Sequence, residues 1–204
     1  MIKFYGAALS GNCHKVRMLL SMLQIPHEVV PISLPNMDHK TPAHIARNPL
    51  GTVPVIEDGD VVIYDSQAIL VYLAAKHGGD QKDNLWLPGE PSEQALVQQW
   101  LSFAVNEIWN GPALARAFLL FDRDVDLARC QAAGKAALSI LEGRLRQHDW
   151  LALDHPTIAD IACYPYSALA EAGEISLAPY EAVRAWFKRI EALPGYVSMP
   201  GLGD

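Results

Sequence analysis

The order of strand and helix signals in the first 78 residues constrains this chain more than any other feature of its sequence. A short apolar run at residues 2–5 predicts a buried strand. From Val16 to Leu23 the apolar positions recur at the i, i+3, i+4, i+7 spacing of an amphipathic helix. Residues 27–32 predict a second strand, so the chain opens with a βαβ unit.

A hairpin followed by a helix is predicted next. Two apolar runs, 53–56 and 61–64, flank an Asp-Gly pair, which is a strong hairpin turn signal. Ser66 then opens a helix that ends at Gly78, whereas residues 33–51 are predicted to be loop with about one helical turn. The order βαβ followed by ββα is therefore complete by residue 78.

The remainder of the chain carries helix signals without a strand signal of comparable strength. Residues 79–90 are polar and broken by glycine and proline, which predicts a linker anchored by Trp86. Thr157 and Asp160 fit a capping box at the start of a helix. Residues 91–204 therefore predict a helical bundle. The apolar positions that mark its successive helices are Leu96, Trp100 and Phe103, then Leu138, Leu141 and Leu145, then Ile158 and Ile161, then Val183, Trp186, Phe187 and Ile190.

Composition restricts the environment and the partners. No apolar run reaches the length of a membrane helix and the N-terminus lacks a secretory pattern, so we expect a cytoplasmic protein. The three cysteines are far apart and lack metal-ligand spacing, which indicates free thiols and no metal site. A net charge of −7 argues against nucleic acid or an anionic membrane as partner.

Positive charge is nevertheless concentrated near the N-terminus. Residues 1–47 hold five lysines and arginines against two acidic residues, a charge of +3, so the remainder carries −10 of the total of −7. An acidic protein with one basic segment can hold a small anion there, although a solvated face explains the same charges.

The segment from Ser10 to Cys13 lies between the first predicted strand and the first predicted helix. A helix N-terminus stabilises an anion or a thiolate. A dithiol oxidoreductase would have Cys-x-x-Cys here, whereas this chain has Ser-x-x-Cys. The Ser10 hydroxyl can donate a hydrogen bond to a bound thiolate, which would lower the thiol pKa by roughly one to two units. Ser10 is also explained as an N-cap, and Cys13 as a small buried residue.

Residues 48–54 form a second candidate segment, Asn-Pro-Leu-Gly-Thr-Val-Pro. A cis Val53–Pro54 peptide would leave the N–H and C=O groups of Val53 free to pair with an extended peptide ligand. A trans proline at the start of an edge strand is the alternative.

Two polar pairs complete the candidate site. Asp65 and Ser66 begin a predicted helix, where they either cap it or bind the ammonium and carboxylate groups of an α-amino acid. His39 and Lys40 lie in a loop, where they are either solvated or bind a second carboxylate. Taken together, the candidate segments describe a ligand with a thiol, a peptide backbone, an amino-acid end and a carboxylate end, which is glutathione.

Four segments carry a resemblance to a known family: SGNCHKVRMLL, HKTPAHIARNPLGTVPVIEDGD, YDSQAILVYLAAK and HPTIADIACYPY. They resemble the soluble glutathione transferases, especially the serine-type, theta- and phi-like classes and their bacterial relatives. The motifs recur in the family's order across essentially the whole chain. The resemblance implies an α/β thioredoxin-like domain at 1–78, a linker at 79–90 and an all-α domain at 91–204.

The resemblance also implies roles for individual residues. Ser10 would activate the thiol of glutathione, the cosubstrate. The other implied glutathione contacts are His39 and Lys40 at the glycine carboxylate, Thr52, Val53 and cis Pro54 at the cysteinyl backbone, and Asp65 and Ser66 at the γ-glutamyl end. Asp65 departs from the family, because most relatives have Glu there.

The expected activity is conjugation of glutathione to a small hydrophobic electrophile by a homodimeric enzyme of detoxification. Trp109 and Phe118 are candidates for the electrophile pocket. Two alternatives stay open. One is a glutathione-dependent thiol oxidoreductase that uses Cys13, and the other is a noncatalytic glutathione-binding module.

Overall fold

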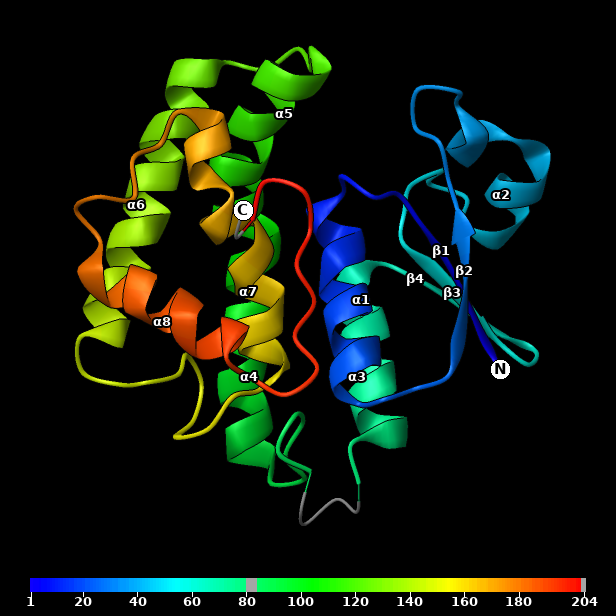
Figure 1. The fold of residues 1–204 in the computed structure, drawn as a ribbon, viewed down its shortest axis with the longest axis horizontal. Coiled ribbons are helices and arrows are strands. Elements are labelled where there is room, and N and C mark those ends of the chain that lie inside the picture. The colour runs from blue at the N-terminus through cyan, green and yellow to red at the C-terminus, as the bar shows by residue number, and fades with distance from the viewer. Residues whose placement is uncertain (80–83, 203–204) are drawn as a thin grey trace.

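The N-terminal half of the chain forms a mixed sheet with helices on both faces (Figure 1). The computed structural model describes residues 1–79 and 84–202 of the whole chain. The predicted order, βαβ followed by ββα, is confirmed, with two short helices between the two units. The elements are β1 (Ile2–Gly6), α1 (Gly11–Met22), β2 (His27–Pro31), η1 (Asp38–Lys40), α2 (Pro42–Arg47), β3 (Val55–Asp58), β4 (Val61–Tyr64) and α3 (Ser66–His77).

The sheet has the strand order β2-β1-β3-β4. β1 pairs with β2 in parallel, and the β1–β3 and β3–β4 pairs are antiparallel. α1 and α3 lie between the sheet and the C-terminal helices, whereas α2 lies on the opposite side of the sheet (Figure 1). The prediction that the third strand begins at Val53 was wrong: β3 begins at Val55, after the cis Val53–Pro54 peptide.

In the part of the C-terminal half that the structure describes, all regular elements are helices. Its elements are α4 (Pro91–Phe103), the π-helical segment η2 (Ala104–Ala113), α5 (Leu114–Phe121), α6 (Leu127–Leu145), α7 (Ile158–Ala168), η3 (Ala170–Gly173) and α8 (Glu181–Glu191). Residues 80–83 of the expected linker lie outside the described residues. None of the described helices is long and apolar enough to cross a membrane.

The two halves share one apolar core. α1 is largely buried, because α3 and α7 pack against it and it lies beside the sheet (Figure 1). The predicted capping box is present at the start of α7, where the buried Asp160 carboxylate accepts hydrogen bonds from the backbone N–H of Thr157 and of Leu151 and from the Trp186 indole. α7 is thereby fixed at the centre of the molecule.

The helix that begins the C-terminal half differs from its prediction in one respect. Leu96 was expected on the apolar face but is exposed, because the buried positions are Val97, Leu101, Ala104 and Ile108, at i, i+4, i+7 and i+11. Beyond Phe103 the chain continues as η2, where Gly111 departs from helical backbone angles and packs closely on Gly134 of α6.

Candidate functional site

A cavity of about 550 Å³ lies between the two halves of the molecule. It brings together all eight residues predicted to bind glutathione, although they come from four separate segments of the sequence. They are Ser10, His39, Lys40, Thr52, Val53, Pro54, Asp65 and Ser66. The opposite wall comes from η2, α5 and α7 of the helical half.

Ser10 lies at the mouth of α1. Its backbone is extended, with φ −86° and ψ 117°, and its Oγ accepts a hydrogen bond from the backbone N–H of Cys13 at 3.3 Å. Ser10 is therefore the N-cap of α1. Because the Oγ accepts in this bond, its own hydrogen stays available for donation to a ligand in the cavity.

Cys13 faces the protein interior instead. Its side chain is 0% exposed, does not line the cavity, and accepts a hydrogen bond at Sγ from the backbone N–H of Ala7 at 3.3 Å. Burial raises the pKa of the Cys13 thiol, and the hydrogen bond with Ser10 offsets this only in part. The helix N-terminus thus offers the cavity a hydroxyl and keeps the thiol protonated inside the fold.

The loop before β3 presents free backbone groups at the cis Val53–Pro54 peptide. The Asn48 side chain, fully buried, donates to Thr52 O at 2.9 Å and accepts from the backbone N–H of Leu50 at 3.0 Å. His44 contacts the same Thr52 oxygen at 2.9 Å. Within the described residues, no hydrogen bond is made by the Val53 backbone. The Val53 peptide groups can therefore pair with a ligand.

His39 and Lys40 approach this loop from η1. The Lys40 ammonium donates to Leu50 O at 3.2 Å. Gly51 has φ +57°, and a Cβ there would lie 2.8 Å from Lys40 Nζ and 3.0 Å from His39 O. Only glycine allows this close approach without strain. Burial, together with the Lys40 charge, lowers the pKa of His39, which favours a neutral ring at neutral pH.

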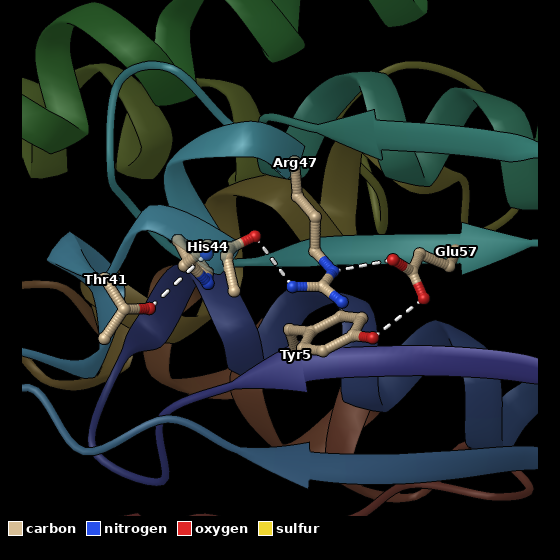
Figure 2. Close-up of polar contacts among 6 residues, drawn as sticks. Tyr5, Thr41, His44, Arg47 and Glu57 are labelled. Atoms are coloured by element: carbon tan, nitrogen blue, oxygen red, sulfur yellow. Dashed lines mark hydrogen bonds and ion pairs between the residues drawn. The ribbon is translucent and has the colours of Figure 1, made fainter.

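An ion pair holds α2 against the sheet (Figure 2). Arg47 Nε donates to Glu57 Oε1 at 2.6 Å, and the Tyr5 hydroxyl donates to Glu57 Oε2 at 2.7 Å. The Arg47 guanidinium also stacks over the Tyr5 ring at 4.6 Å. This contact ties α2 to β1 and β3, and so positions the segment that carries Lys40.

Asp65 and Ser66 form the third part of the site, at the start of α3. Asp65 has φ 73°, a conformation that L-residues rarely adopt, and its Oδ1 accepts from the backbone N–H of Gln67 and of Ala68. Within the described chain the second carboxylate oxygen makes no hydrogen bond, so it can accept from an ammonium group. Ser66 is buried and donates to Gln67 Oε1 at 2.7 Å.

Sequence reasoning did not single out four residues that line the cavity: Lys15, Arg116, Arg123 and Tyr166. Lys15 is buried, donates to Asn12 Oδ1 at 2.8 Å, and lies 5.6 Å above the Tyr166 ring. Burial lowers the pKa of Lys15 to about 8. Burial raises the pKa of the Tyr166 hydroxyl, which stays protonated beside Ser10. The one available signal was Lys15, which lies four residues before the buried Leu19 on the first helix, whereas no comparable pattern marks Arg116.

One of the two aromatic candidates for the electrophile wall does not reach the cavity. Trp109 lines it, but Phe118 does not, and Phe121 takes that place. On α5 and the turn before it, Ala113, Ala117 and Phe121 follow at intervals of four and share one face, whereas Phe118 is rotated about 100° from Ala117. The structure therefore places Phe118 outside the lining of this cavity.

These features define a thioredoxin-like protein with an added all-α domain. They are the mixed four-stranded sheet, the cis proline opposite a helix N-terminus, and the cavity that the helical second half closes. The model of the glutathione S-transferase N-terminal domain matches residues 4–81, and that of the C-terminal domain matches residues 113–194. The chain belongs to the glutathione S-transferase family. It is accordingly a transferase whose cosubstrate is glutathione.

Individual relatives agree with this assignment. A probable glutathione S-transferase GSTF1 from rice, Oryza sativa, is 31% identical over 95% of this chain and 92% of its own. The crystal structure of a glutathione S-transferase from Pseudomonas fluorescens superposes with a TM-score of 0.89 at 33% identity, covering 98% of both chains. A glutathione transferase homologue from Drosophila mojavensis, solved with bound glutathione, superposes with a TM-score of 0.83 at 30% identity, covering 95% of this chain and 88% of that one.

Proposed function

We propose that this enzyme conjugates the thiolate of glutathione to a small electrophile with an apolar body, and that Ser10 activates the thiol. The Ser10 hydroxyl donates a hydrogen bond to the sulfur, and the N-terminus of α1 favours the negative charge. The enzyme supplies acidity and position, and the cosubstrate supplies the nucleophile. The observation that carries the proposal is that Ser10 lines the cavity while Cys13 is buried.

The remaining contacts bind the two ends of the tripeptide. Lys40, with the neutral His39, holds the glycine carboxylate, and the free N–H and C=O groups of Val53 pair with the cysteinyl backbone. Asp65 accepts from the γ-glutamyl ammonium through its unused oxygen, while Ser66, through its backbone N–H, and the N-terminus of α3 bind the adjoining carboxylate. All of these groups line the same cavity, which supports one extended ligand.

Two variants separate this function from a thiol oxidoreductase that uses Cys13. Ser10→Ala should lower kcat/KM for conjugation of 1-chloro-2,4-dinitrobenzene roughly 10- to 100-fold, the value of one charge-assisted hydrogen bond. Cys13→Ser should leave conjugation intact, provided that circular dichroism shows the fold preserved. A loss of deglutathionylation with Cys13→Ser, accompanied by unchanged conjugation in Ser10→Ala, would instead establish the oxidoreductase.

A noncatalytic binding module makes a different prediction. It would be retained on immobilised glutathione but would conjugate none of a panel of electrophiles. Retention together with turnover supports the transferase, and failure to bind the resin contradicts every function proposed for this cavity.

Cytoplasmic location and a homodimer form part of the proposal. The lack of a membrane-spanning helix among the described residues is compatible with the first, and the family resemblance supports the second. Multi-angle light scattering should give twice the mass of one chain, which is 22.4 kDa. A mass equal to that of one chain would reject the dimer.

A further inference from the structure

Two arginines lie on the wall of the cavity that the helical half provides. Arg116, on α5, is only 4% exposed, and Arg123 follows α5 in an exposed loop. Both line the cavity opposite the segments that carry the glutathione contacts. Neither is needed for the proposed recognition of the tripeptide.

Arg116 has unused hydrogen-bond donors. Within the described residues its guanidinium makes one hydrogen bond, from Nη1 to Leu9 O at 3.1 Å, and its buried Nε has no partner. No carboxylate of the described chain forms an ion pair with Arg116 or Arg123. A buried guanidinium with open donors is unfavourable unless a ligand supplies acceptors.

Aromatic rings hold both guanidinium groups in place. Arg116 lies 5.4 Å from the centre of the Phe121 ring, and Arg123 lies 5.8 Å from that of Trp109. Contact between a ring face and a guanidinium leaves the donor edge of the guanidinium free. The two rings also line the cavity, so they provide apolar surface beside the charge.

The charge of the cavity exceeds what glutathione neutralises. Lysine and arginine contribute four lining side chains, Lys15, Lys40, Arg116 and Arg123, against the single carboxylate of Asp65, although the whole chain carries −7. Glutathione with an ionised thiol brings two carboxylates, a thiolate and one ammonium. The charged lining residues therefore sum to +3 and glutathione to −2, so one positive charge stays unneutralised. Both arginines lie on the wall opposite the proposed glutathione contacts.

We infer that the electrophile carries a carboxylate, which Arg116 and Arg123 bind while its apolar body packs against Trp109 and Phe121. This inference rests on the proposed conjugation. Arg116 also holds Leu9, the residue before Ser10, so a carboxylate bound there places the rest of the electrophile toward the sulfur. Arginine matches a carboxylate with paired N–H donors.

The reaction itself needs no further reactant. With a chloroarene carboxylate as electrophile, the glutathione thiolate attacks the ring carbon that bears chlorine and forms a C–S bond. The C–Cl bond then breaks, and chloride leaves with the bonding pair. The carboxylate stays unchanged throughout, and no group is oxidised or reduced.

A matched pair of substrates tests the inference: 4-chloro-3-nitrobenzoate and its methyl ester, with kcat/KM of each divided by its uncatalysed rate. The wild-type enzyme should prefer the acid after this correction. Arg123→Met and Arg116→Met should each lower the acid-to-ester ratio roughly tenfold, the loss expected for one charge-assisted contact. Arg116→Lys should retain part of the preference, because it keeps the charge without the paired donors.

Controls separate charge recognition from damage to the site. Arg129→Met removes an exposed positive charge of α6 outside the cavity lining and should leave the ratio unchanged. A shift of Leu9 in Arg116→Met would slow both substrates equally, which the ratio does not register. If Arg116→Met fails to fold, the exposed Arg123 carries the test.

The outcomes distinguish the two proposals. The carboxylate inference is overturned if the enzyme conjugates the ester and 1-chloro-2,4-dinitrobenzene but does not prefer the acid. It is also overturned if neither arginine variant changes the acid-to-ester ratio. In both cases the transferase function still holds. No turnover of any of the three substrates by the wild-type enzyme overturns both.

Discussion

Ser10 and Cys13 lie three residues apart at the same helix N-terminus, yet one side chain lines the cavity and the other is buried in the core. The hydroxyl faces the cavity, whereas the thiol lies inside the fold and accepts a bond from the Ala7 backbone. Burial raises the pKa of Cys13, so the helix dipole alone does not ionise it. This burial favours the proposal that the reactive sulfur at this position comes from bound glutathione.

Lys15 is the residue at which function and stability conflict most directly. Its ammonium is buried without an acidic partner among the described residues, and a pKa of about 8 leaves it mostly charged at neutral pH. Lys15→Met should therefore raise the free energy of unfolding, by about 1–3 kcal/mol, because a buried charge is replaced by an apolar side chain. It should also raise the pKa of the bound thiol by removing a cation from the cavity.

Urea unfolding and a pH titration of enzyme-bound glutathione measure these two effects. The interpretation of Lys15 would be contradicted by a variant that is less stable than the wild type and whose bound thiol titrates unchanged.

At the scale of elements, α1 is the helix on which both the core and the site depend. Its N-terminus faces the cavity through Ser10, while its body lies between the sheet and α7. Such a position buries even polar side chains, and His14 is fully buried with neither ring nitrogen hydrogen-bonded within the described chain.

His14 predicts a loss of stability in mild acid. Burial, with a smaller contribution from Arg17, lowers its pKa from 6.5 to about 4. Because the unfolded chain binds the proton first, stability is complete above pH 6.5 and falls as the pH drops toward 4, by about 3 kcal/mol. His14→Met should remove this part of the pH dependence in urea titrations. Identical pH slopes for the two proteins would reject the assignment.

Local signals predicted the elements of the N-terminal half and eight of the residues that line the cavity. A cap such as Ser10, the Asp-Gly turn before β4 and the capping box of α7 each depend on residues within a few positions, so one sequence reveals them. The phase of α5 and the start of β3 at Val55 depend on packing between distant segments. Arg116 and Tyr166 reach Leu9 and Gly11 across about a hundred residues or more, a contact that no spacing rule encodes.

At the scale of the whole molecule, the cavity exists only where the two halves meet. The N-terminal half contributes the proposed glutathione contacts, and η2, α5 and α7 contribute the opposite wall. Gly11, the first residue of α1, makes a close approach between them, because a Cβ there would lie 2.7 Å from the Tyr166 ring. The absence of a side chain at Gly11 lets the Tyr166 hydroxyl, on α7, reach the cavity.

Gly11→Ala should therefore destabilise the chain, by about 1–3 kcal/mol, and slow conjugation by moving α7 away from α1. Combining it with Tyr166→Leu should recover part of the lost stability, which a double-mutant cycle measures as a coupling energy. Gly143→Ala is the matched control, since a Cβ added there would meet no atom within 4 Å and alanine favours the helix. Strictly additive effects of the Gly11 and Tyr166 changes would argue against this interface.

The central claim is that the Ser10 hydroxyl stabilises the glutathione thiolate, and the pH dependence of the bound thiolate's ultraviolet absorbance tests it most directly. The wild-type protein should lower the thiol pKa below that of free glutathione, and Ser10→Ala should raise it again by roughly one to two units. Equal apparent pKa values for the two proteins, both saturated with glutathione, would contradict the account.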